Sequence, residues 1–333
     1  MSRLAARISE HPVLAFFVTT YLLSWPLFFL VLFVFPRNMV LQGTFGSLAV
    51  FAPALACMLV ARASVPDQTK KRTAAKWITF LITWLVAWLT LVIFVTHVHN
   101  SPLGAPLVVF GGVLAILPAF TASRAFSTTT GVRSYFRSLV LPRGNVVWYL
   151  VALLTFPAIQ LAGLGLTQLF GFRAESEPAM DVSIDPAVAG LMFLHGFFFA
   201  GGINEESGWR GFALPVLQRR FCPLAAALIV WVFWALWHLP IDVTSGDAVS
   251  SILVNRLFFN AMWSVLFMWV FNRTKGSVLA PALFHPSMNT SGDLLPATDA
   301  ATVLFAILVL VVIVSERMWR RLPGSDPEMN ASM

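Results

Sequence analysis

Residues 13–35 read VLAFFVTTYLLSWPLFFLVLFVF, a run of 23 residues that contains no charged side chain. An α-helix needs roughly 20 apolar residues to cross the hydrocarbon core of a bilayer, so this run predicts a transmembrane helix. Similar blocks follow it, and we predict an all-α polytopic membrane protein with about ten transmembrane helices. The expected spans are 13–35, 45–61, 77–96, 104–123, 146–170, 187–204, 222–240, 253–272, 277–291 and 301–315.

The composition indicates the same class of protein. Of the 333 residues, 58% are hydrophobic and 11% are charged, and the mean hydropathy is +0.79, whereas a soluble domain carries about 25% charged residues. The longest stretches between apolar blocks (62–76, 123–145 and 171–186) are too short to bury a core. A soluble enzyme is therefore excluded, and the two cysteines, Cys57 and Cys222, suggest no disulfide.

The basic residues indicate how the chain is oriented. With the amino terminus in the cytoplasm, 19 of the 22 Lys and Arg residues fall in the cytoplasmic segments, as the positive-inside rule requires. Arg37 and Arg173 fall in outer loops, and Arg256 is expected to extend from its span to the outer interface. We therefore predict that both termini are cytoplasmic, and that the net charge of +7 reflects membrane insertion and needs no nucleic-acid partner.

A few polar residues interrupt the apolar blocks of the carboxy-terminal half. The segment GGINEESGWRGF at 201–212 carries Glu205, Glu206 and Arg210. On a helix, Glu206 and Arg210 share one face in the favoured order for an ion pair, whereas Glu205 points away from them by about 100°. A structural salt bridge explains that pair but leaves Glu205 unpaired. Since an ionisable group is costly inside a bilayer, Glu205 is a candidate general base facing a cavity.

Histidines recur later in the chain and extend this pattern. His238 lies four residues after Trp234, and Asn289 lies four residues after His285, so each pair shares a helix face. A helical hairpin over 205–238 has its midpoint at residues 221–223, directly after two arginines, where a cytoplasmic turn belongs. Glu205 and His238 then stand at one height, roughly 25 Å from the turn. This hairpin requires the sixth span to continue past the glutamates as a bent helix.

Three signatures therefore occur in order: EExxxR from Glu205 to Arg210, an aromatic residue with a histidine at Trp234 and His238, and HxxxN from His285 to Asn289. Together with the string ESGWRGFALP after the first glutamate, they resemble the CPBP family of intramembrane glutamate endopeptidases, which includes the type II CAAX prenyl proteases and is also called the Abi family. The resemblance covers residues 187–291. Trp234 stands where the family motif usually has Phe.

The resemblance implies hydrolysis of peptide bonds within the membrane by glutamate-activated water, in a cavity open to the cytoplasmic side. Glu205 would be the general base, and His238 would help to hold the water. His285 and Asn289 would stabilise the oxyanion of the tetrahedral intermediate. Three neighbours would support the site: Glu206, Arg210 and Trp234. The substrate would be a hydrophobic, membrane-associated or prenylated peptide, and no cofactor would be required.

Other functions remain compatible with these residues. Glu205, His238 and His285 match the His2Glu ligand set of a catalytic zinc site, so a zinc-dependent intramembrane metalloprotease is an alternative, although HExxH is absent. A proton-coupled transporter is another, because buried Glu and His residues between broken helices form such pathways. A third is a non-catalytic membrane immunity or scaffold protein that retains the site by descent.

We divide the chain into three parts. Residues 1–145 hold the amino-terminal transmembrane helices and basic loops, 146–318 the CPBP-like helical core, and 319–333 a cytoplasmic tail. The expected partners are membrane lipids and the peptide substrate, and the expected location is a bacterial plasma membrane. His195, beside a small-xxx-small pair in the sixth span, is expected to make an interhelical hydrogen bond.

Overall fold

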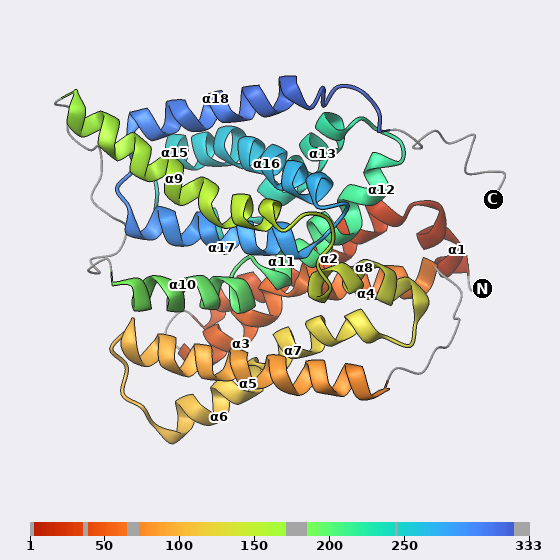
Figure 1. Ribbon diagram of the computed structural model, residues 1–333. Helices are drawn as coiled ribbons and strands as arrows, with labels where there is room; N and C mark the ends of the chain where they lie inside the picture. Colours follow the sequence, from red (N-terminus) through yellow and green to blue (C-terminus); the bar gives the residue numbers. More distant parts are fainter. Residues whose placement is uncertain (1–2, 36–38, 65–72, 171–184, 244–245, 323–333) are drawn as a thin grey trace.

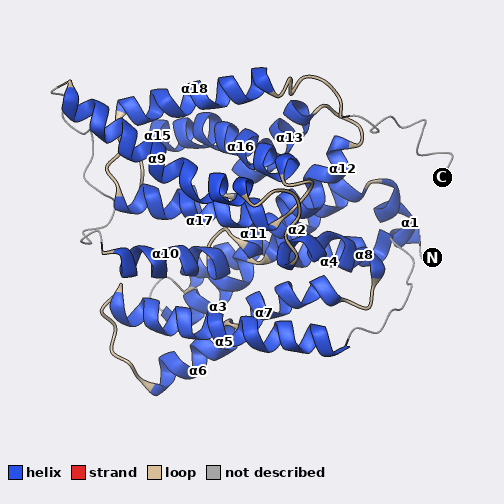
Figure 2. Cartoon of the chain, in the orientation of Figure 1, coloured by secondary structure: helices blue, strands red, loops and turns tan. Residues whose placement is uncertain are grey.

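The computed structural model describes residues 3–35, 39–64, 73–170, 185–243 and 246–322, and every regular element in these ranges is a helix (Figures 1 and 2). The predicted all-α class is confirmed. The amino-terminal elements are α1 (Arg3–Glu10), α2 (Pro12–Phe29), η1 (Leu30–Val34), α3 (Met39–Val50), α4 (Ala52–Ser64), α5 (Thr73–His97), α6 (Ala105–Leu114), α7 (Ile116–Ser123), η2 (Arg124–Phe126) and α8 (Thr130–Val140).

The carboxy-terminal elements follow without a change of class. They are α9 (Val147–Leu169), α10 (Pro186–Phe199), α11 (Ile203–Gly208), η3 (Trp209–Ala213), α12 (Leu214–Gln218), α13 (Pro223–Trp237), α14 (Leu239–Asp242), α15 (Val249–Leu253), η4 (Val254–Phe259), α16 (Asn260–Arg273), α17 (Leu279–Leu294) and α18 (Asp299–Ser315). Of the expected features, Arg37, Arg173 and most of the tail, 323–333, lie outside the described residues.

The number of spans is smaller than the sequence suggested. Within the described ranges, six helical stretches are long and apolar enough to cross a bilayer, and the bent pair formed by α3 and α4 raises the number to seven. The stretches are Pro12–Val34, Ala74–His97, Ala105–Phe126, Val147–Leu169, Pro186–Gln218 and Val249–Arg273. The remaining expected spans correspond to α13 and α18, which are apolar but short, and to α17, which carries the polar HPSMN segment. The expectation of ten is thereby corrected.

Apolar side chains cover the outside of the bundle. On α5, Leu81 and Ile82 are 58% and 59% exposed, and on α18, Leu310 and Val314 are 62% and 61% exposed. Faces of this kind are buried in a soluble protein but face lipid tails in a membrane. They support the polytopic membrane fold.

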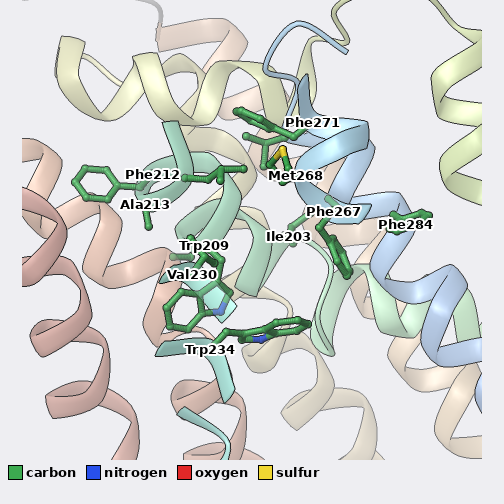
Figure 3. Packing of buried hydrophobic residues seen from close by; sticks show 14 of the residues in the cluster. Ile203, Trp209, Phe212, Ala213, Val230, Trp234, Phe267, Met268, Phe271 and Phe284 are labelled. Carbon is green, nitrogen blue, oxygen red and sulfur yellow. The ribbon is translucent and has the colours of Figure 1, made fainter. Parts of the chain in front are cut away.

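Aromatic rings form a large part of the buried interior. The helices α5, α10, α17 and α9 lie side by side in that order, with α18 beyond α9 (Figure 1). Trp209, Trp234, Phe267 and Phe284, from η3, α13, α16 and α17, belong to one buried cluster and have little or no exposure (Figure 3). This apolar centre surrounds the few polar residues of α11, so it sets the environment of the candidate site.

A break separates α10 from α11. α10 ends at Phe199, and Gly201 adopts a φ of +106°, a conformation that favours glycine. A Cβ atom at this position would lie 2.4 Å from Nε2 of His285, so glycine is also required by the close approach of α17. The break redirects the chain and brings Glu205 and Glu206 to the middle of the bundle.

The predicted hairpin is confirmed. The helix continues past the glutamates through the π-helical turn η3 to Gln218, and α13 begins at Pro223, so the turn occupies residues 219–222. Pro223 stands at the first helical position, where its fixed φ suits a helix start. The π-helical turn lies directly after α11, which carries the glutamates, and such irregularities recur at functional sites.

Candidate active site

Glu205 lies at the centre of the site, on α11. Its side chain is 6% exposed, and its Oε2 atom accepts a hydrogen bond of 2.8 Å from Nε1 of Trp234 on α13. The described residues form no hydrogen bond to the other carboxylate oxygen, Oε1. Glu205 therefore has one oxygen fixed by an indole and one oxygen available to a water molecule.

Glu206 faces another direction and is fully buried. Its Oε1 atom accepts hydrogen bonds of 2.8 Å from Nη1 of Arg210 and of 2.8 Å from Nδ1 of His285. Because a carboxylate only accepts, the proton on His285 must lie on Nδ1. The two adjacent glutamates thus have separate environments, as their angular separation on a helix predicted.

Arg210 is enclosed by aromatic rings. Its guanidinium carbon lies 4.5 Å from the centre of the Trp234 ring and 4.2 Å from that of Phe267. A cation over an aromatic face is attracted by the ring quadrupole. The side chain is 1% exposed, so Glu206 and the two rings together compensate its buried charge.

His238 is oriented by the backbone of its own helix. Its Nδ1 atom lies 2.8 Å from the carbonyl oxygen of Trp234, one helical turn earlier. The carbonyl accepts, so Nδ1 carries the proton, and Nε2 remains for a ligand or water. Asn289 on α17 donates a long hydrogen bond of 3.4 Å from Nδ2 to the carbonyl oxygen of Ala200 at the helix break.

One cavity of about 300 Å³ unites these groups. Its lining includes four residues predicted from the sequence: Glu205, His238, His285 and Asn289. Trp234 lines it as well, while Glu206 and Arg210 are absent from the lining; Glu206 holds His285, and Arg210 in turn holds Glu206. The structure therefore brings the three sequence signatures together, although their roles remain predictions.

The cavity also contains residues that the sequence analysis missed. Asn255, Arg256 and Asn260 form part of its wall. Arg256 does not extend to the outer interface as expected, because its guanidinium forms two hydrogen bonds with Asp242, of 2.8 and 2.7 Å. A signal for this was present in the sequence, since a charged residue inside an apolar helix marks a functional candidate.

His195 behaves differently from the expectation. Its ring stacks on Phe94 at a centroid distance of 4.0 Å and on Phe199 at 5.7 Å. It forms no hydrogen bond with another described residue, so it is a packing residue between α10 and α5. The close packing expected from its small neighbours is present, because a Cβ on Gly196 would lie 2.9 Å from Cβ of Pro286.

Among the residues that the structure describes, no three His, Cys, Asp or Glu side chains are grouped closely enough to hold a metal ion. Nδ1 of His238 and Nδ1 of His285 are both occupied by protein acceptors. A zinc site would have to use the Nε2 atoms together with Glu205. The zinc alternative therefore remains a prediction that metal removal tests.

The fold and the cavity define a multi-pass membrane protein in which a carboxylate, two histidines and an amide surround a cavity, an arrangement suited to hydrolysis. Residues 187–291, which include all of these groups, match the family model of the Rce1-like type II CAAX prenyl endopeptidases. A protein of Methanococcus maripaludis named CAAX prenyl protease 2 is 25% identical over 182 residues, which cover 51% of this chain and 66% of that relative.

The match thus spans slightly less than two thirds of the relative's length. Both comparisons confirm the resemblance to the CPBP and CAAX protease-like family that the motifs predicted. The matching family is described as endopeptidases, and the relative is named as a protease. Trp234, which stands where the family motif usually has Phe, donates a hydrogen bond to Glu205 that a phenyl ring could not provide.

Proposed function

We propose that this chain is an intramembrane endopeptidase that hydrolyses a hydrophobic or prenylated peptide with a water molecule activated by Glu205. One observation carries the proposal: Glu205, His238, His285 and Asn289 line the same cavity inside an apolar bundle. A membrane-embedded hydrolase needs a base, a water position and oxyanion donors within reach of each other. The relative from Methanococcus maripaludis is named a CAAX prenyl protease, which supports the substrate class.

In the proposed reaction, water lies between Oε1 of Glu205 and Nε2 of His238. Glu205 takes a proton from the water while the water oxygen attacks the carbonyl carbon of the scissile peptide bond. The tetrahedral intermediate collapses when Glu205 returns that proton to the leaving amine. Water is consumed, and a new carboxyl group and a new amine are released.

The oxyanion of the intermediate needs donors. Nδ2 of Asn289 is one, because its present bond to the carbonyl oxygen of Ala200 is long and easily exchanged. Nε2 of His285 is the other, and it donates only when the imidazole carries both protons. Nδ1 of the same ring is hydrogen-bonded to Glu206, which fixes the orientation of the ring and leaves Nε2 for the substrate. Each such donor is worth about 3 kcal/mol in the transition state.

The test is a peptide mass spectrometric comparison of membranes that contain wild-type protein or the Glu205→Gln variant. A matched control is Glu316→Gln, which removes a carboxylate that pairs with Arg273 far along the chain from the site. We expect a set of cleavage products that occurs with wild type and the control and is absent with Glu205→Gln. Identical products in all three samples would contradict the proposal.

Two of the alternatives give distinct results in related experiments. Solute uptake that depends on Glu205 without any peptide cleavage would identify a transporter. A cellular phenotype that survives alanine at Glu205, His238 and His285 would identify a non-catalytic protein. Both termini are proposed to be cytoplasmic in a bacterial plasma membrane, which terminal tags tested with a protease on intact cells would verify.

A further inference from the structure

Arg256 is an unusual residue for its position. It lies in the stretch Val249–Arg273, which is apolar enough to span a bilayer, and a charged group inside such a helix is costly unless it serves a function. It occupies the π-helical turn η4, and Nε1 of Trp231 donates a 2.7 Å hydrogen bond to its carbonyl oxygen. Such turns occur frequently at functional sites.

The guanidinium is held from one side by Asp242. Nε donates to Oδ2 at 2.8 Å and Nη2 donates to Oδ1 at 2.7 Å, so the two groups meet through a planar pair of parallel hydrogen bonds. The Asp242 side chain is 9% exposed and the Arg256 side chain is 21% exposed. This geometry fixes the plane of the guanidinium and leaves the edge between Nη1 and Nη2 outside the pair.

The guanidinium of Arg256 has N–H donors that no described residue uses. A guanidinium has five N–H bonds. Two are used by Asp242, and Nη1 contacts Oδ1 of the fully buried Asn260 at 3.5 Å. In the described part of the chain, two N–H bonds of Arg256 therefore have no acceptor. One of them belongs to Nη1 and the other to Nη2, and neighbouring donors in the plane of a guanidinium are the arrangement that binds a carboxylate.

The distribution of charge on the cavity wall also favours the binding of a carboxylate at Arg256. Among the described residues that line the cavity, Glu205 is the only carboxylate and Arg256 the only guanidinium. Asp242 does not belong to the lining, so the countercharge of Arg256 lies behind the wall while the cation faces the cavity. A substrate in the cavity thus meets a base at Glu205 and a fixed positive group at Arg256.

We propose that Arg256 is a substrate-binding residue that receives a carboxylate of the peptide, either its free carboxyl terminus or an acidic side chain. The inference rests on the proposed peptidase function, which it extends to the class of substrate. Asp242 and Asn260 are positioning residues that hold the guanidinium. The bound carboxylate anchors the peptide and so determines which peptide bond lies at Glu205.

The test measures binding separately from catalysis. The full chain carrying Glu205→Gln is purified in lipid nanodiscs, and fluorescence anisotropy reports the binding of labelled peptides. The probe is the peptide cleaved in the mass spectrometric comparison, or an apolar peptide with a prenylated cysteine if none is cleaved. It is synthesised with a free carboxyl terminus, as a carboxamide, and as a carboxamide with one internal Glu.

One of the two carboxylate forms is expected to bind about 10- to 100-fold more tightly than the carboxamide, the range for a charge-assisted pair. The form that binds tightly identifies the source of the carboxylate. Adding Arg256→Gln should abolish the difference, and the carboxamide binding that remains reports whether the variant is folded. Arg256→Lys keeps the charge without the planar edge and should retain only part of the preference.

Equal binding of all three peptides to the protein with intact Arg256 would overturn the inference, and this comparison does not depend on the folding of any Arg256 variant. A preference that survives Arg256→Gln would overturn it as well. If wild type cleaves no peptide but the binding preference is present and depends on Arg256, the carboxylate site stands and the peptidase proposal fails. The two failures are therefore distinguishable.

Discussion

Replacement by glutamine is expected to affect the two adjacent glutamates differently: at Glu206 it should lower stability, and at Glu205 it should abolish cleavage. Glu206→Gln removes the charge that compensates Arg210, and the side chains of this pair are 0% and 1% exposed. Removing one partner of a buried ion pair costs about 3–5 kcal/mol, because the other charge remains uncompensated. We expect the free energy of unfolding of Glu206→Gln to fall by about this amount.

Glu205→Gln should leave the free energy of unfolding within about 1 kcal/mol of wild type, since the amide oxygen still accepts from Trp234 and no buried cation loses its only carboxylate partner. It should nevertheless abolish peptide cleavage. The assay is equilibrium unfolding in mixed micelles followed by circular dichroism, with cleavage measured on the same samples.

A double variant provides the internal control. Glu206→Gln combined with Arg210→Met removes both charges, so part of the lost stability should return. An unchanged unfolding free energy for Glu206→Gln, or an equal loss for Glu205→Gln, would refute the assignment of one glutamate to structure and the other to chemistry. No recovery in the double variant would show that the pair is not the source of the effect.

Three further predictions concern the surroundings of the site. Gly201→Ala places a Cβ 2.4 Å from the ring of His285 at a φ of +106°. This variant should lower cleavage by roughly 100-fold. Gly190→Ala is the control: its Cβ meets no atom within 4 Å, so it should match wild type in the same assay. Trp234→Phe keeps the aromatic wall but removes the 2.8 Å hydrogen bond to Glu205, so kcat should fall by about tenfold, and an unchanged kcat would show that this bond has no catalytic effect. Purified protein stripped of metal by a chelator should keep its activity, and activity lost on stripping and restored by zinc would establish the metalloprotease alternative.

Local patterns were sufficient to predict the hairpin. Pro223 after a pair of arginines marked the turn, and the helical rise placed the glutamates opposite the end of α13. The hydrogen bond between Glu205 and Trp234, residues 29 positions apart, is the direct result. The predicted ion pair between Glu206 and Arg210 is also confirmed, because it depends only on the spacing of side chains on one helix.

Long-range contacts were beyond such reasoning. The hydrogen bond from His285 to Glu206 joins residues 79 positions apart and depends on the break at Gly201. The pattern of apolar residues in the sequence does not predict that break. Arg256 and Asp242 were considered singly, one as an interfacial cation and the other as an outer-loop acid. Their pairing joins two different helices, α14 and η4, so the spacing of residues on one helix does not predict it. The span count was too high because α13 and α18, with 15 and 17 residues, are short for a bilayer crossing, and α17 carries a polar segment.

The hydrogen bond from Trp234 to Glu205 makes the site optically readable. Indole fluorescence and the vibrational bands of its N–H group respond to the acceptor, and a carboxylate accepts more strongly than a neutral carboxyl group. The chain contains 12 tryptophans, so the difference spectrum between wild type and Trp234→Phe isolates this one ring. A peptide or inhibitor that changes the protonation of Glu205 would alter that signal, which provides a label-free assay that requires no knowledge of the substrate.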